Sequence, residues 1–271
     1  MIGDFAYVGL GLVILLFAGD ALVKGAVNLA LRLGVPTLIV SLTIVAFGTS
    51  APELLVSVRA ILDGAPGIAL GNVVGSNTAN ILLVLGVPAL IATMHTSKSD
   101  SQDSFLQMIG ATALFIGLAF TGVFTWWSGL ILLAALAAML THAAYVTRCH
   151  RRDMKAAAAA AGPAEDEEIE GADPNLKGWK IGLFLTLGLI GLPLGADLLV
   201  EGAVNIATAF GISETAIGLT LVAIGTSLPE LATTVVAAVR RHTDVALGNV
   251  IGSNMFNLLG IIGLASLVGP I

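Results

Sequence analysis

Two glutamates, Glu53 and Glu230, stand in nearly the same apolar surroundings although they are 177 positions apart. Each ends a short motif that also carries Thr, Ser and Pro, GTSAPE at Gly48–Glu53 and GTSLPE at Gly225–Glu230. Carboxylate, hydroxyl and carbonyl oxygens are hard ligands of the kind that bind Na⁺ and Ca²⁺. These residue types therefore predict cation binding, with the two glutamates supplying the negative charge.

The two motifs belong to a longer repeat, in which residues 20–86 recur at 197–263 without a gap. About half of the aligned positions are identical. A second shared string, ALGNVVGSNTAN at Ala69–Asn80, returns as ALGNVIGSNMFN at Ala246–Asn257. A duplicated apolar segment with one acid in each copy is typical of a cation site on a pseudo-two-fold axis.

A proline precedes each glutamate, at Pro52 and Pro229. Proline lacks an N–H and clashes with the carbonyl four residues earlier, so we expect the helix to unwind and to free backbone oxygens. Unwound backbone inside a membrane is tolerated only where it is buried in protein or lines a wet cavity. Proline kinks and close packing of small residues are the plain alternative, but they do not explain why the same combination occurs twice in register.

The composition places these motifs in a membrane. The chain is 56% hydrophobic and only 11% charged, which leaves too few charges to cover a soluble domain. Stretches of this length span a bilayer as helices. The single Cys149 rules out an intramolecular disulfide, and no basic patch suggests nucleic acid. Eight apolar segments are expected, at roughly 4–33, 36–62, 66–92, 104–122, 124–147, 178–210, 213–240 and 244–269.

Residues 148–176 are expected to form a solvated linker, because they combine an Ala run with a Gly-, Pro- and acid-rich stretch. Ten of the 12 Lys and Arg residues fall on one side of an eight-span arrangement. The positive-inside rule makes that side cytoplasmic and puts both termini outside a cell (inner or plasma) membrane. Five spans precede the second copy, so the two copies are predicted to be inverted relative to each other.

Two polar pairs accompany the repeat. Asp20 and Lys24 lie four positions apart in the first span, so they share a helix face and are expected to neutralise each other. Asn28 and Asn205 occupy equivalent positions in the two copies, and we expect them to make hydrogen bonds between packed helices.

GTS-x-PE followed by GN-V-x-GSN-x-x-N, in two copies, resembles the sodium/calcium exchanger family of cation/Ca²⁺ antiporters, in its microbial type. The resemblance implies an all-α integral membrane protein with the inverted-repeat antiporter fold. Helices 2, 3, 7 and 8 of that fold are broken, and the long first and sixth helices slide as a gate. The expected organisation is a first half at 1–147 with five helices, a cytoplasmic linker at 148–176, and a second half at 177–271. This second half has three helices and lacks the last two of the family's usual ten, so the chain is either truncated or a shortened member.

The resemblance also implies a set of ion ligands. Glu53 and Glu230 are the central carboxylates, shared by Ca²⁺ and Na⁺. Hydroxyl or backbone oxygens come from Thr49, Ser50, Thr226 and Ser227, and backbone carbonyls from Ala46 and Ala223. The Na⁺ positions are lined by Gly75, Ser76, Gly252 and Ser253, and the middle of the site is faced by Asn80 and Asn257.

The expected function is Na⁺/Ca²⁺ antiport by alternating access. We expect no dependence on K⁺, because Asn257 stands where the potassium-dependent branch, and several microbial members, carry Asp. The alternative is an H⁺- or K⁺-coupled cation antiporter of the same fold; a channel is a further possibility. An intramembrane hydrolase is disfavoured, since no His lies in the motif spans to activate Ser50 or Ser227. The expected partners are inorganic cations and membrane lipid, with no enzyme activity, no cofactor, no nucleic acid and no protein partner implied.

Overall fold

A computed structural model describes residues 2–94, 100–160, 173, 175–212 and 223–271, and every regular element within these ranges is a helix. In the first part of the chain these are α1 (Ile2–Leu33), α2 (Thr37–Val40), the π-helix η1 (Ser41–Val45), α3 (Ala46–Thr49), α4 (Ala51–Leu62), α5 (Pro66–Ala79), the π-helix η2 (Asn80–Val84), α6 (Gly86–Ile91), α7 (Asp100–Ala119) and α8 (Trp126–Ala160). The second part contains α9 (Gly178–Ala209), α11 (Ala223–Gly225), α12 (Leu228–Val239), α13 (Thr243–Met255), the π-helix η4 (Phe256–Ile261) and α14 (Ile262–Val268).

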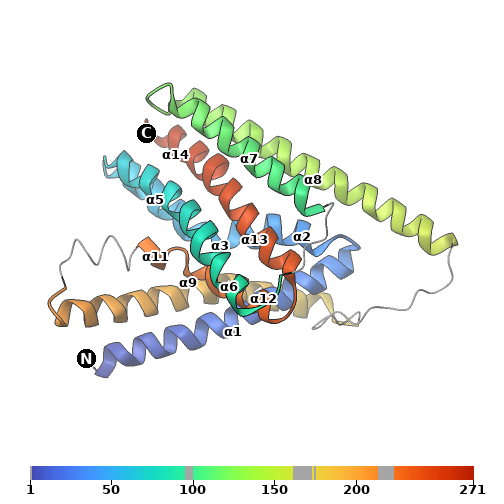
Figure 1. Cartoon of the computed structure of the whole chain (residues 1–271), viewed down its shortest axis with the longest axis horizontal. Helices are drawn as coiled ribbons and strands as arrows, with labels where there is room; N and C mark the ends of the chain where they lie inside the picture. Colours follow the sequence, from blue (N-terminus) through green and yellow to red (C-terminus); the bar gives the residue numbers. More distant parts are fainter. Residues whose placement is uncertain (1, 95–99, 161–172, 174, 213–222) are drawn as a thin grey trace.

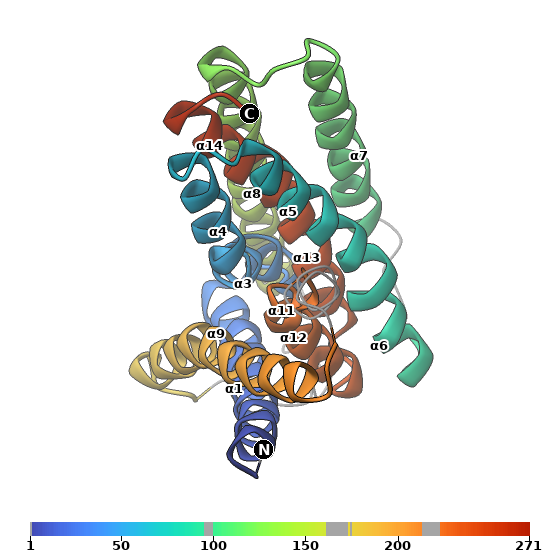
Figure 2. The ribbon, with the colours of Figure 1, turned by 90° about the vertical axis from the view of Figure 1, so that its left-hand side faces the viewer.

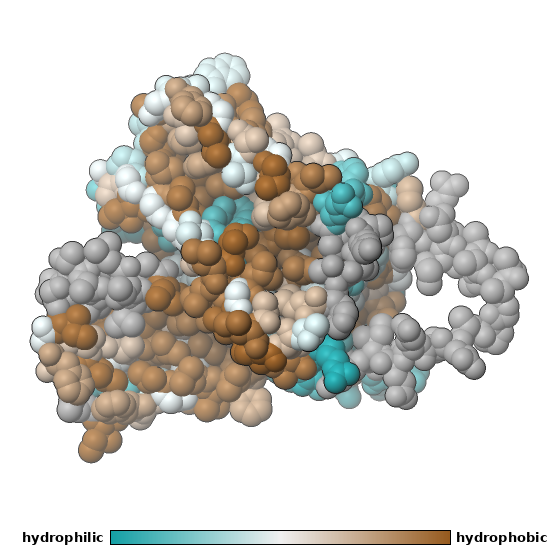
Figure 3. Space-filling model, viewed as in Figure 1, coloured by the Kyte–Doolittle hydropathy of each residue, from teal (hydrophilic) through white to brown (hydrophobic). Residues whose placement is uncertain are grey.

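Five helices among the described residues are long and apolar enough to cross a membrane, and a sixth crossing results if the bent pair Thr37–Thr49 and Ala51–Leu62 counts as one span. The surface is also typical of a membrane protein, since Figure 3 shows a largely hydrophobic face. The prediction of an all-α membrane protein is therefore confirmed. Part of the expected span at 213–240 lies outside the described residues.

The long helices α1 and α9 run antiparallel along most of their length, side by side in Figure 1. Glycines allow this close approach: a Cβ on Gly11 would lie only 2.7 Å from the carbonyl oxygen of Gly195. Asn205 donates a hydrogen bond to Asp4 at 3.1 Å, and Asn28 accepts one at 2.9 Å from the backbone N–H of Asp173. The predicted packing role is thus confirmed for Asn205, which bonds between α9 and α1, whereas Asn28 bonds to Asp173, which lies outside the helices, and to the Lys24 carbonyl of its own helix.

The first motif interrupts its span at Ser50, where the axis bends by 44° between α3 and α4. The second motif interrupts its span at Thr226 and Ser227, between α11 and α12. Pro52 and Pro229 lie in the first turn of the helix that follows each break. A missing N–H costs nothing in that turn, so the proline ends one helix and begins the next.

The interruptions of the third and eighth spans take the form of π-helices rather than gaps, since η2 begins at Asn80 and η4 at Phe256. Single π-helical turns inside α-helices are frequent at functional sites. The span Thr243–Val268 crosses the middle of the molecule, between α5 and the α7–α8 pair in Figure 2. In its most apolar 18-residue stretch, 89% of the residues are buried, against 22% in the repeat-related span Pro66–Ile91.

Helix α8 continues through Arg148–Ala160, the segment expected to begin the linker. An Ala run has high helix propensity, which accounts for the extension. The rest of the expected linker, apart from Asp173, Asn175 and Leu176, lies outside the described residues.

Candidate cation-binding site

The two glutamates of the motifs are buried together. Glu53 has 1% of its surface exposed and Glu230 has 0%. They lie in the first turns of α4 and α12, and their carboxylates interact electrostatically. A helix N-terminus favours a negative charge, but two ionised carboxylates out of water need further compensation.

Hydroxyl groups of each motif are directed to the carboxylate of the other repeat. The Ser50 hydroxyl donates a hydrogen bond to Glu230 Oε1 at 3.1 Å, and Thr49 also interacts with this carboxylate. Thr226 in turn interacts with the carboxylate of Glu53. The serines of α5 and α13 complete this shell: Ser76 interacts with Glu53, and Ser253 with Glu230. The two motifs therefore form one site.

Each glutamate is held in place by one asparagine, and neither asparagine was predicted from the sequence. Asn72 donates to the Glu53 carbonyl at 3.1 Å and to the Ser57 hydroxyl at 3.0 Å. Asn249 donates equivalent bonds to the Glu230 carbonyl at 3.3 Å and to Thr234 at 3.1 Å. The signal was present in the sequence, since both asparagines follow the Gly of the repeated ALGN string.

Four further asparagines bond across the repeats. Asn80 donates to Asn254 Oδ1 at 3.1 Å, and Asn257 donates to Asn77 Oδ1 at 3.0 Å. These bonds fix the amide planes of Asn80 and Asn257, so each turns its own side-chain oxygen away from the bond. Asn77 and Asn254 were also missed, although they are the last residues of the two GSN strings.

Five buried side-chain oxygens in the described part of the chain have no hydrogen-bond partner: Glu53 Oε2, Glu230 Oε2, Asn80 Oδ1, Asn257 Oδ1 and Ser227 Oγ. All five belong to residues predicted to bind ions. Buried polar atoms in proteins are nearly always satisfied, so a group of unsatisfied ones requires an explanation. Carboxylate, amide and hydroxyl oxygens with free lone pairs suit a hard cation. The described residues hold no group of three or more His, Cys, Asp or Glu side chains able to bind a metal, so the charge comes from two carboxylates alone.

Other predicted ligands are placed less directly. The carbonyl of Ala46 already accepts bonds from the Ser50 N–H at 3.1 Å and the Thr49 hydroxyl at 3.3 Å. Gly252 packs tightly against Leu42. Gly75 is exposed, and no described atom lies within 4 Å of where its Cβ would be. Ala223 begins α11, and its side chain lies outside the described set.

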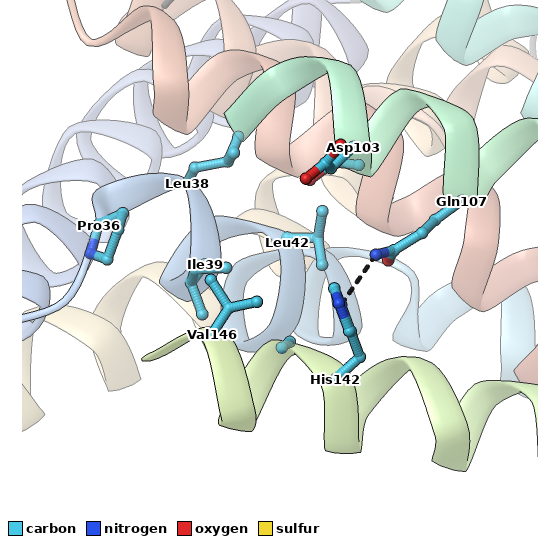
Figure 4. A pocket seen from close by; sticks show the side chains of 10 residues that line it. Pro36, Leu38, Ile39, Leu42, Asp103, Gln107, His142 and Val146 are labelled. Atoms are coloured by element: carbon cyan, nitrogen blue, oxygen red, sulfur yellow. Dashed lines mark hydrogen bonds between the residues drawn. The ribbon is translucent and has the colours of Figure 1, made fainter. Parts of the chain in front are cut away.

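A separate small pocket, of about 50 Å³, lies between α2, α7 and α8 (Figure 4). Its polar side chains include Gln107 and His142, which form a hydrogen bond of 3.0 Å, and the exposed Asp103. None of the five unsatisfied oxygens lines this pocket. The candidate cation site is therefore the one at the glutamates.

Apolar spanning helices around two buried carboxylates and a set of unsatisfied oxygens define a membrane cation transporter. The family described as "Sodium/calcium exchanger protein" matches residues 4–145 and 180–271. The chain belongs to this family, and it is a cation/Ca²⁺ antiporter rather than an enzyme.

Individual relatives agree with this assignment. The sodium/calcium exchanger MaX1 of Methanosarcina acetivorans is 35% identical over 300 residues, covering 99% of this chain and 84% of the relative. The inner membrane protein YrbG of Escherichia coli K12 is 34% identical over 263 residues, covering 96% of this chain and 78% of the relative. A solved structure of the sodium-calcium exchanger NCX_Mj is similar with a TM-score of 0.81 at 35% identity, over 99% of this chain and 83% of that one.

Proposed function

We propose that this protein exchanges Na⁺ for Ca²⁺ by alternating access, with Glu53 and Glu230 as the charge shared by both ions. The observation that supports this proposal most directly is the group of five unsatisfied buried oxygens contributed by both repeats. Oxygen donors from two repeats suit a cation held between them, near the middle of the membrane. Thr49, Ser50, Thr226, Ser76 and Ser253 complete the proposed ligand set together with backbone carbonyls.

Charge compensation accounts for exchange. Glu53 and Glu230 carry two negative charges, which one Ca²⁺ or two Na⁺ cancel, whereas a third Na⁺ leaves the site positive. An empty site with two ionised carboxylates is costly to enclose away from water. Only a loaded site therefore passes between the two sides, and Na⁺ and Ca²⁺ compete for it. The sodium gradient then drives Ca²⁺ movement.

Independence of K⁺ follows from the neutral side chain at position 257. The Asn257 amide donates to Asn77 and leaves only its oxygen for an ion. A carboxylate there would add a third negative charge, which Ca²⁺ alone would not compensate. We therefore propose that no K⁺ is carried with Ca²⁺.

The two copies are proposed to be inverted, with both termini outside and the linker cytoplasmic. Trp126 and Trp127 stack at 4.0 Å between ring centroids at the start of α8 and are half exposed, as expected for residues at a membrane interface. Arg148 lies beyond the apolar part of the same helix, Trp126–Val146. The opposite ends of α8 thus carry the features expected of the outer and inner interfaces.

Ion-gradient experiments in proteoliposomes test the coupling. Vesicles loaded with Na⁺ and diluted into Na⁺-free medium are expected to take up ⁴⁵Ca²⁺, and adding K⁺ on either side is expected to leave the rate unchanged. Vesicles with an acid interior and no Na⁺ test the H⁺-coupled alternative. Uptake that needs the acid interior, or that rises several-fold with K⁺, would overturn the proposed coupling.

A further inference from the structure

The two repeats are packed differently against the long helices α1 and α9. Helix α1 lies on α12, and a Cβ on Gly19 would be 3.3 Å from the carbonyl oxygen of Ala232. The repeat-related helices α9 and α4 have no comparable contact. Among the described residues, the long helices therefore close one face of the site region and do not cover the related face.

Burial of individual residues shows the same difference. Val23 and Val27 of α1 are fully buried in a cluster with Val245 at the start of α13. The residue equivalent to Val245 is Ile68 at the start of α5, and 59% of its surface is exposed. A cluster that is complete on the α1 side is thus absent at Ile68 on the α9 side.

An ion pair joins the closed face. Arg240, which directly follows α12, pairs with Asp20 in the middle of α1, and about 30% of each side chain is exposed, 27% and 31%. The expected partner of Asp20 was Lys24, but the Lys24 ammonium lies over the ring of Phe184 at 5.8 Å from its centroid. Asp20 thus bonds across the α1–α12 interface instead of along its own helix, because the Arg240 side chain is brought against it.

The repeat does not reproduce this ion pair. The positions equivalent to Asp20 and Arg240 are Asp197 and Asp63, which are both acidic. Asp63, which directly follows α4, pairs with Arg59 of that helix at 2.8 Å. If α9 packed on α4 as α1 packs on α12, two carboxylates would stand where an ion pair stands now. Closing the two faces therefore has different electrostatic consequences.

We propose that Asp20 and Arg240 are positioning residues for transport, because they hold α1 on α12, the helix that carries Glu230. The ion pair favours the state in which the α1 face is closed over the state in which the α9 face is closed. This inference rests on alternating access, but it concerns the balance between two conformations and can be measured without any ion flux.

Accessibility of two single cysteines measures that balance. In a Cys149→Ser background, I68C reports on the open face and V245C on the closed face, each labelled by a hydrophilic maleimide in detergent-solubilised protein, where the reagent reaches both sides. In protein that keeps both Asp20 and Arg240, we expect the maleimide to label I68C fast and V245C slowly. Asp20→Asn or Arg240→Gln is expected to speed V245C by a factor of about two to five, the range for a partly exposed ion pair, and to slow I68C by a smaller factor, because I68C reports on the more populated state.

Two comparisons separate the proposed bias from a loosened fold. The exposed pair Arg59–Asp63 supplies the control, and Arg59→Gln is expected to lack the reciprocal change. Exchanging the charges with Asp20→Arg and Arg240→Asp is expected to restore the original labelling. Faster labelling of V245C without slower labelling of I68C, or no change at either position, would overturn the proposal. If the protein with the unaltered ion pair shows no ⁴⁵Ca²⁺ exchange, that result would instead count against the proposed function.

Discussion

The hydroxyl of Ser50, in the first repeat, donates a hydrogen bond to the carboxylate of Glu230, in the second, at 3.1 Å. Its repeat equivalent, the hydroxyl of Ser227, is buried and has no partner. The two halves of the site are therefore related in sequence but are not identical in bonding. An ion that binds between them meets one hydroxyl that donates to the protein, at Ser50, and one that makes no bond to the protein, at Ser227.

Replacing Ser227 with Ala is expected to weaken Ca²⁺ binding more than it affects folding, because its oxygen makes no bond to the protein. Loss of one neutral ligand corresponds to about 1 kcal/mol, or about fivefold in the Ca²⁺ concentration for half-maximal uptake. Thr78→Ala is the matched control, since Thr78 is exposed and bonds only within its helix, to the Val74 carbonyl. Equal effects of the two variants on ⁴⁵Ca²⁺ uptake would contradict the assignment of Ser227 as a ligand.

Asn249→Ala is expected to destabilise the protein, because it removes three buried hydrogen bonds: two that Asn249 donates, to the Glu230 carbonyl and to Thr234, and one that it accepts from the Thr49 hydroxyl at 3.2 Å. Leaving buried groups unsatisfied costs about 1–3 kcal/mol, which lowers the melting temperature of a protein of this size by roughly 2–4 °C per kcal/mol. Thermal unfolding in detergent measures the loss. Asn72→Ala is expected to behave similarly, and a clear effect at only one of the two would show that the asparagines are not equivalent.

Asn257→Asp is expected to make exchange respond to K⁺. The substitution adds a negative charge beside two carboxylates, so Ca²⁺ alone no longer neutralises the site and a further monovalent cation is needed. Uptake of ⁴⁵Ca²⁺ into Na⁺-loaded vesicles, with and without K⁺, provides the measurement. Asp103→Asn, which alters an exposed acid of the separate pocket beside α7, serves as the control. Exchange by the Asn257→Asp variant at the same rate with and without K⁺ would count against this charge argument.

Gly248→Ala is expected to impair packing of α13 on the first broken span. Its Cβ would lie 2.8 Å from the carbonyl oxygen of Leu38, a distance that backbone atoms do not tolerate. Overpacking of this kind typically costs about 1–3 kcal/mol. Gly117→Ala, on the exposed face of α7 with no described atom near its Cβ, is expected to be neutral. Melting temperatures of the two variants that fall by the same amount would contradict this account.

The sequence predicted the elements and residues whose signals are local or repeated. Proline and glycine marked the breaks at Ser50 and Ser227, and the repeat identified Glu53 and Glu230. The partners of Asp20 and Lys24 could not be predicted in this way, because Arg240 is distant in the chain and reaches Asp20 only through packing of α1 on α12. The π-helices were missed for a similar reason, since nothing in the sequence near Asn80 distinguishes a π-helical turn from a break.

The central claim is that Glu53 and Glu230 are the shared charge of the ion site, and ⁴⁵Ca²⁺ uptake driven by an outward Na⁺ gradient tests it most directly. Glu53→Gln and Glu230→Gln each remove one of two buried charges, at a cost of about 3 kcal/mol or more. We predict that either substitution lowers the exchange rate more than about a hundredfold, while Asp103→Asn, at an exposed acid of the separate pocket, leaves it unchanged. Exchange at the wild-type rate by Glu53→Gln in correctly folded protein would contradict the account.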